Sequence, residues 1–202
     1  WFDENRKRYE DYVKEPFKAF LNAMQAAIMR YDKKYAPQKP HKIAFRISRD
    51  TRFSKDKTPY KPHLSAFFSH RGRAKDYPGN YLQIDPDRLM VGGGIYGLKP
   101  KPPHNVREFL YNNREDFRAI IEEPEFVKTF GEVQGEKNKL LPKALKAKAE
   151  EEPLLYNKGW YVMAQLPPAL ATSEQLIPKV IETMIIAEPL TDFFRIAMSE
   201  GA

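Results

Sequence analysis

The chain has 202 residues, of which 42% are hydrophobic and 30% charged, with no cysteine and a net charge of +7. A length of this order suits one globular domain that buries about 70% of the surface of its unfolded chain. The balance of hydrophobic and charged residues excludes a disordered protein. The missing cysteine excludes disulfides, zinc ribbons and thiol nucleophiles, and no apolar run or leader points to a membrane or to secretion, so we expect a reducing, cytoplasmic location and no membrane partner.

Residues 3–34 are predicted to form an amphipathic helix, because apolar side chains recur there at steps of three and four. Pro16 either kinks this helix or opens a second one, since proline lacks the N–H that an interior turn requires. Residues 1–36 are therefore expected to be the helical part at the start of the chain.

Residues 42–97 contain four short segments that are rich in aromatic and β-branched residues and bounded by Pro, Gly or Asp, a pattern typical of strands. They are KIAFRIS (42–48), HLSAFFS (63–69), NYLQID (80–85) and RLMVGGGIY (88–96). The DPD run at 85–87 predicts a tight turn between the last two. Strands this close in sequence pair in antiparallel fashion, because a parallel crossover needs enough chain for a helix.

Residues 103–202 return to helical periodicity, with helices expected at 105–112, 114–122 and 123–130. A polar, lysine-rich part mixes loop with helix, residues 159–166 predict one further strand, and Thr172 with Gln175 resembles a capping box that opens the last helix. Helices, then strands, then helices predict a single α+β domain. Its antiparallel sheet, of about four to six strands, is packed by helices from both chain ends.

The run GGGIYG at 92–97 has the letters of the dinucleotide-binding fingerprint G-x-G-x-x-G. That motif requires a helix to begin at its glycines, whereas the next residues, LKPKPP, contain three prolines that exclude one. We therefore expect Gly92, Gly93 and Gly94 either to relieve crowding at a bulge or a close strand crossing, or to line a ligand pocket with bare backbone.

The basic excess is concentrated between residues 42 and 75, which hold ten Lys or Arg against two Asp and leave the rest of the chain near neutral. Its densest part is RISRDTRFSKDKTPYK, residues 46–61. Two interpretations are open: the charges bind an anionic partner, or they form a solvated strand face paired with acids from the helices.

A regular strand over residues 43–53 would carry Arg46, Asp50 and Arg52 on one face, about 6.6 Å apart at each step of two. Guanidinium groups arranged in this way, with a carboxylate to orient them, can bind a phosphate or a carboxylate bidentately. In the same register Arg49 falls on the apolar face, so either a bulge turns it outward or a buried carboxylate pairs with it.

The sequence shows no clear motif for metal binding or for nucleophilic catalysis. The four histidines have no zinc-ligand spacing, and neither a nucleophile elbow nor a phosphate-binding lysine loop occurs, so no metal and no cofactor is predicted. His63, close to Lys61, is either a general acid or base or a hydrogen-bonded surface group. The aromatic residues of the basic region offer stacking surfaces to bases, but without an RNA-recognition signature we interpret them as core.

The run from Arg46 to Tyr60 resembles the motif of a bacterial and fungal family known as domain of unknown function 2461. That motif is Arg-x-x-Arg-Asp-x-Arg-Phe followed by Asp or Asn, Lys and Tyr. The matching residues here are Arg46, Arg49, Asp50, Arg52, Phe53, Asp56, Lys57 and Tyr60.

WFDENRKRYE, GGGIY and EEPLLYNKGWYV resemble further landmarks of that family, so the resemblance covers nearly the whole chain. In the family another helix normally precedes the Trp-Phe opening, and a histidine often stands where this chain has Glu152. The resemblance implies no activity.

We expect a domain that binds an anionic, phosphorylated small ligand. The predicted site residues are Arg46, Arg49, Asp50, Arg52, Lys57, Tyr60 and Lys61, with Gly92, Gly93 and Gly94 as nearby backbone. Of these, Arg46, Arg52 and Lys57 hold the anion, Arg49 and Asp50 form an orienting pair, and Tyr60 and Lys61 close the site. No nucleophile or general base stands out, so an enzyme and a binding domain are both open. The alternatives are a nucleic-acid-binding domain, or a structural or interaction protein whose arginines form internal ion pairs.

Overall fold

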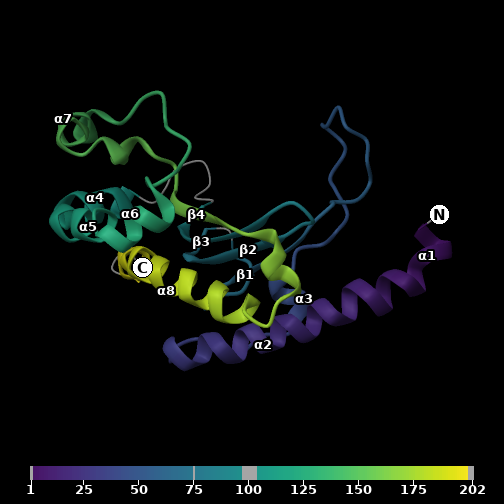
Figure 1. The fold of residues 1–202 in the computed structure, drawn as a ribbon. Helices are drawn as coiled ribbons and strands as arrows, with labels where there is room; N and C mark the ends of the chain where they lie inside the picture. The colour runs from purple at the N-terminus through teal and green to yellow at the C-terminus, as the bar shows by residue number, and fades with distance from the viewer. Residues whose placement is uncertain (1, 75, 97–103, 200–202) are drawn as a thin grey trace.

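The computed structural model describes residues 2–74, 76–96 and 104–199. These residues form one α+β domain, in which an antiparallel sheet is packed by helices from the early and the late parts of the chain (Figure 1). The predicted fold class is confirmed. No helix among the described residues is both long and apolar enough to cross a bilayer.

The sheet has four strands within the described residues, in the order in which they occur along the chain. Its strands are β1 (Leu64–Phe68), β2 (Gly79–Ile84), β3 (Leu89–Ile95) and β4 (Trp160–Leu166). The predicted turn between β2 and β3 is confirmed: the Asp85 amide donates to the Arg88 carbonyl at 2.9 Å, and the Asp87 amide donates to the Asp85 carboxylate at 3.0 Å. The strand predicted at 159–166 is β4, which pairs with β3.

The N-terminal part is one long helical rod, made of α1 (Phe2–Tyr9), a π-helical segment (Glu10–Lys14) and α2 (Glu15–Tyr31). The Glu15 amide donates to the carbonyl of Glu10, five residues back, immediately before Pro16. Pro16 has no N–H to donate to the helix. The wider π turn before it accommodates the missing hydrogen bond, so the helical rod continues.

The strand expected at 42–48 does not form, and this prediction is wrong. Residues 40–43 form a short helix, α3 (Pro40–Ile43), because Pro40 suits a first helical turn. The chain then makes isolated bridges, Ala44 with Ala66 and Ser48 with Tyr60, in place of a strand. Residues 46–60, which we call the arm, stand away from the sheet as a long loop (Figure 1). The basic motif therefore lies beside the sheet and is not one of its strands, because most of its residues are charged or polar and are costly to bury on a sheet face.

The second half of the chain is mainly helical, as predicted. Its α-helices are α4 (His104–Asn112), α5 (Arg114–Ile121), α6 (Pro124–Phe130), α7 (Lys143–Glu151) and α8 (Leu176–Ser199), with 3₁₀ turns at Pro153–Tyr156 and Pro168–Thr172. The capping box predicted at Thr172 is wrong, because Thr172 donates to the Ala169 carbonyl while the Ser173 hydroxyl accepts from the Gln175 amide at 3.1 Å.

Helices cover one face of the sheet. In Figure 1, α8 runs under the strands and α2 lies beside it, while α4, α5 and α6 gather at the far end of α8. Alternate strand residues point toward these helices and are buried, among them Leu82, Val91 and Val162. The other face of the sheet carries the candidate site.

Candidate functional site

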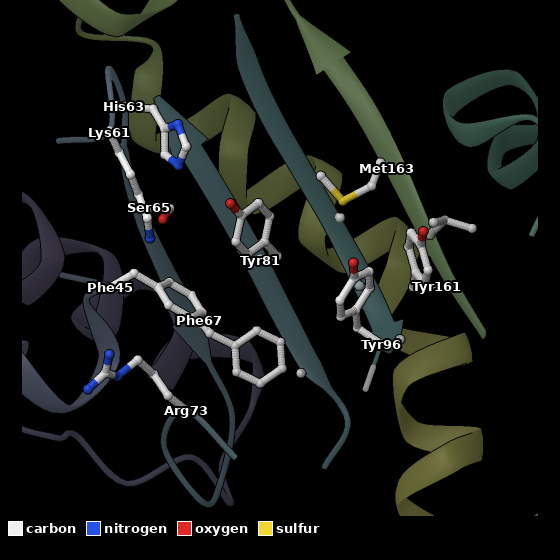
Figure 2. A pocket seen from close by; sticks show the side chains of 15 residues that line it. Phe45, Lys61, His63, Ser65, Phe67, Arg73, Tyr81, Tyr96, Tyr161 and Met163 are labelled. Carbon is white, nitrogen blue, oxygen red and sulfur yellow. The ribbon is translucent and has the colours of Figure 1, made fainter. Parts of the chain in front are cut away.

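The uncovered face of the sheet is hollowed rather than flat. The hollow has a volume of about 440 Å³, and the strand residues that line it alternate with those that face the helices. These residues are Ser65 and Phe67 of β1, Gly79 and Tyr81 of β2, Gly92 and Gly94 of β3, and Tyr161 and Met163 of β4 (Figure 2). An antiparallel sheet normally turns polar side chains to solvent on its open face. Here that face presents aromatic rings and bare backbone.

Glycines give the hollow its depth. Gly94 has φ +113, a conformation that disfavours side chains, and a Cβ there would lie 2.8 Å from the Tyr161 Cα and closer still to the Trp160 carbonyl. A Cβ on Gly79 would lie 2.8 Å from the Phe67 ring. The middle of the sheet is therefore bare because the neighbouring strands leave no room for side chains.

The triple glycine relieves crowding, but not at a bulge or a strand crossing, because β3 pairs continuously with β2 and β4 through Gly92, Gly93 and Gly94. Gly93 faces the helices, where a Cβ would meet Ala187 of α8 at 2.8 Å and the Thr191 hydroxyl at 2.9 Å. The same hydroxyl accepts from the Gly94 amide at 3.0 Å and so fixes the helix against the strand. Gly92 and Gly94 lie on the opposite side and contribute backbone to the hollow. The LKPKPP run that follows lies outside the described residues.

Aromatic rings form the walls. Tyr96 and Tyr161 meet edge to face with their centroids 4.9 Å apart, and Tyr96 is 68% exposed. Across the hollow, Phe45 from the base of the arm packs against Tyr81 at 6.1 Å. Partial burial raises the pKa of Tyr81 and of Tyr161, so both phenols stay neutral near pH 7. The walls thus combine flat apolar surface with neutral hydroxyl groups.

One end of the hollow is cationic. Lys61 and His63 lie side by side there, just before β1 (Figure 2). Burial lowers the pKa of His63, and the positive charge of Lys61 lowers it further, while the negative charge of Asp85 raises it by less. No Asp or Glu is among the described residues that line the hollow. The hollow therefore has a positive potential that its own lining does not cancel.

Arg73 stands at the rim beside Phe45, with its guanidinium carbon 5.6 Å from the ring centroid. Its Nε donates to the Lys42 carbonyl at 3.0 Å, and its Nη2 donates to the His41 carbonyl at 3.4 Å. In Figure 2 the guanidinium turns away from the tyrosines, so Arg73 borders the hollow without reaching its centre.

The structure divides the residues predicted from the sequence among three places. Lys61 and the triple glycine line the hollow. Arg46 and Tyr60 line a separate cleft of about 610 Å³ between the base of the arm and the N-terminal rod, where Tyr60 stacks on Phe2 at 4.6 Å.

The remaining four predicted residues lie on the arm and interact within it. Arg52 donates to both carboxylate oxygens of Asp50, at 2.9 and 2.7 Å, and Lys57 donates to the Thr51 carbonyl at 2.9 Å. Arg49 pairs with Asp56, not with Asp50 as expected for the orienting pair. Hydrogen bonds from Thr58 and Arg49 hold the pKa of the Asp56 carboxyl well below its usual range. Because no strand forms here, Arg49 does not face an apolar core.

Sequence reasoning missed most of the hollow. His63 was considered only as a general acid or base or as a surface group. The missed residues are Phe45, Ser65, Phe67, Arg73, Tyr81, Tyr96, Tyr161 and Met163. Of these, Phe45, Phe67 and Tyr81 were interpreted as core. Phe67 is buried, at 9% exposed, and it also lines the hollow. A usable signal was present: Tyr81 and Tyr161 alternate with buried residues, so the outward face of two strands is aromatic where charged residues are usual.

Comparison with known proteins identifies the family and nothing further. The family of conserved hypothetical proteins DUF2461 matches residues 1–193, which include the hollow, the arm and most of α8. The chain belongs to the DUF2461 family. No curated protein and no solved structure matches it. The resemblance inferred from the sequence is confirmed, and the name of the family assigns no activity.

Glu152, the residue before Pro153, is held by hydrogen bonds inside the protein. It is 1% exposed, and its carboxylate accepts from Arg118 at 2.7 and 2.9 Å and from the Leu154 amide at 3.0 Å. Among the described residues no group of three or more His, Cys, Asp or Glu is placed to hold a metal ion. The hollow is therefore the strongest candidate site in this DUF2461 domain.

Proposed function

We propose that the hollow binds a small organic anion that has a flat, apolar part. The observation that carries the proposal is the lining of the open sheet face: aromatic walls, a backbone floor, and a cationic end with no lining carboxylate. A volume of about 440 Å³ is in the range of small-molecule sites, which are concave and mainly apolar with a few placed polar groups.

The flat part of the ligand belongs among the tyrosines. A ring that leaves water there gains roughly 25 cal/mol for each Å² of apolar surface that it buries. Tyr96 and Tyr161 offer an edge and a face to such a ring, an arrangement that favours offset stacking. An exposed aromatic surface of this kind is typical of a binding site rather than of a solvated sheet.

The anionic part belongs at Lys61 and His63. A lysine ammonium binds phosphate or carboxylate as a point charge, and its three donors adapt to either. His63 is neutral near pH 7 in the free protein, since burial and Lys61 lower its pKa. An anion placed between the two favours the protonated imidazole, so His63 takes up a proton as the ligand binds.

In this proposal the residues of the arm do not bind the ligand of the hollow. Arg49, Arg52 and Lys57 already interact with acceptors on the arm itself. This arrangement is the one expected of a structural role, in which ion pairs define the shape of a loop.

Isothermal titration with adenosine monophosphate and adenosine tests the proposal, because the two differ only in the phosphate. We expect the wild-type protein to prefer the phosphate, and Lys61→Met to lower that preference about tenfold, the equivalent of one charge-assisted hydrogen bond. The matched control is Lys57→Met, which removes the same charge from the arm and is expected to leave binding unchanged. Binding that survives Lys61→Met, or that falls equally in Lys57→Met, contradicts the proposal.

A nucleic acid is the second candidate partner, and one observation favours it. Phe53, on the arm, is 96% exposed, and the Arg52 guanidinium lies over its ring at 5.9 Å. An exposed aromatic ring in basic surroundings can stack on an unpaired base. This candidate predicts binding of single-stranded oligonucleotides that weakens steeply with salt and is lost in Phe53→Ala.

A further inference from the structure

The cleft beside the hollow is also rich in positive charge. It lies between the N-terminal rod and residues 40–48, and we call it the basic cleft. Its charged lining comprises Arg6, Lys14, Lys18, Arg46 and Arg73 against Asp3 and Glu10, with His41 in addition. Cations therefore outnumber acids in a space of about 610 Å³.

Most of these cations take part in no strong ion pair. Lys14 pairs with Glu10 at 3.2 Å and Lys18 with Glu15 at 2.5 Å, one turn away on the same helix, with all four side chains more than 40% exposed. Exposed pairs of this kind contribute little, so a multivalent anion competes with them readily. Arg46 is exposed and makes no salt bridge with any described residue.

The basic cleft and the hollow share a wall. Phe45 and Arg73 line both of them. Lys61 approaches the Phe45 ring at 5.7 Å and Arg73 approaches it at 5.6 Å, so cations stand on the path from one space to the other (Figure 2). A chain of negative charges that starts at Lys61 can follow these cations past Phe45 into the basic cleft.

We infer that the ligand of the hollow carries a chain of two or more phosphates, which runs past Phe45 and Arg73 into the basic cleft. The inference rests on the proposed function and names its ligand class: a flat ring joined to a polyphosphate, as in a nucleoside di- or triphosphate. The ring and first phosphate occupy the hollow, and Lys14 and Arg46 bind the distal phosphates. Lysine and arginine side chains from two separate segments converge on such a chain without needing any one to be buried.

Titration of the full chain with adenosine mono-, di- and triphosphate at one ionic strength tests this inference. In the wild-type protein we expect affinity to rise about tenfold or more from the monophosphate to the triphosphate, as one to two charge-assisted hydrogen bonds are added. In the double variant Lys14→Met/Arg46→Met this rise is expected to disappear, while affinity for the monophosphate stays unchanged.

A charge-matched control distinguishes binding by the cations of the basic cleft from attraction by the protein's net positive charge. Lys55→Met/Lys57→Met removes two charges from the arm and is expected to keep the full rise with phosphate number. A wild-type protein that binds the triphosphate no better than the monophosphate overturns the inference. So does a rise that persists in Lys14→Met/Arg46→Met, or one that is lost equally in the arm control.

Inorganic tripolyphosphate distinguishes failure of this inference from failure of the proposed function. Binding of tripolyphosphate that is lost in Lys14→Met/Arg46→Met but kept in Tyr161→Ala supports the basic cleft, even if adenosine monophosphate fails to bind the hollow. Binding of the monophosphate with none of tripolyphosphate, and no gain for the triphosphate, leaves the hollow and overturns the cleft. Circular dichroism checks that each variant is folded.

Discussion

The arm and the hollow lie next to each other along the chain, but their cationic side chains have different surroundings. The arm holds the densest run of charges in the sequence, yet Arg49 and Arg52 are paired with Asp56 and Asp50 from the arm itself. The hollow has few charges, and no Asp or Glu is among the described residues that line it with Lys61 and His63. The cations best placed to bind a ligand are therefore those that the hollow presents, although the arm has more of them.

The difference also concerns rigidity. The hollow is formed by residues of a paired sheet whose other face is packed by α8. The arm pairs with no strand of the sheet: its Ser48–Tyr60 bridge joins two residues of the arm itself, and Tyr60 at its base stacks on Phe2. A site that holds its groups in place before binding loses less entropy when the ligand arrives. The hollow meets that condition and the arm does not.

The largest effect is expected from the floor of the hollow. Gly94→Ala forces a side chain into φ +113 and against the Trp160 carbonyl and the Tyr161 Cα. Backbone strain and overpacking together are expected to lower the free energy of unfolding by about 3 kcal/mol. Urea denaturation followed by circular dichroism measures this change.

Gly131→Ala is the matched control for Gly94→Ala. Gly131 also has a positive φ, +71, but nothing lies within 4 Å of the position that a Cβ would take. Its replacement is expected to cost only about 1 kcal/mol, from backbone strain alone. Equal losses in the two variants would show that the floor is not tightly packed and would remove the contrast in rigidity.

A smaller effect is expected from pH. The pKa of His63 in the free protein is lowered from 6.5, chiefly by burial and then by Lys61, with Asp85 raising it and Arg88 lowering it by less. A bound anion raises that pKa, so ligand affinity increases as pH falls through the His63 pKa of the complex, by at most about tenfold per unit, and levels off below the pKa of the free protein.

His63→Asn is expected to lose this component of the pH dependence. The phosphate of adenosine monophosphate titrates in the same range, but equally with both proteins, so the difference between the two pH profiles isolates His63. In the absence of ligand the lowered pKa has the reverse consequence: the unfolded state binds the proton first, and stability falls as pH drops below 6.5. Identical pH profiles for wild type and variant would exclude His63 from the anion site.

The smallest effect is expected from the arm. Arg49→Met removes one member of an ion pair whose side chains are 27% and 56% exposed, and such a pair adds little to stability in water. We expect the denaturation midpoint and the affinity for adenosine monophosphate to stay within error of the wild type. A clear loss of ligand affinity would restore the arm to the binding site and reverse the comparison.

Much of the architecture follows from local patterns in the sequence. Periodic apolar residues predicted the N-terminal helix and the helices of the second half. The aromatic and β-branched residues of 63–69, 80–85 and 88–96, bounded by turn residues, predicted three strands and one hairpin. The helix at the start of the chain even passes Pro16, which a single π turn accommodates. The segment 42–48 failed because its apolar letters resemble a strand while Pro40 and the following charges direct the chain into a short helix and a loop.

The candidate site followed from the sequence only in part. Lys61 and the triple glycine were predicted, because the residue type alone shows a positive charge or the lack of a side chain. Tyr96 and Tyr161 were not, because an aromatic residue on a strand looks the same whether its face is covered or open.

The sequence by itself determined most of the helices, the four strands of the sheet, the turn at Asp85 and the family, because these features follow from patterns along the chain. Only the tertiary structure decided which face of the sheet α8 covers, and hence that Tyr161 faces a hollow while Val162 is buried. It also decided that Arg49 pairs with Asp56 within the arm. The physical reason is that burial and ion pairing depend on distances between segments far apart in sequence, such as β1, β4 and the base of the arm, and no local pattern encodes them.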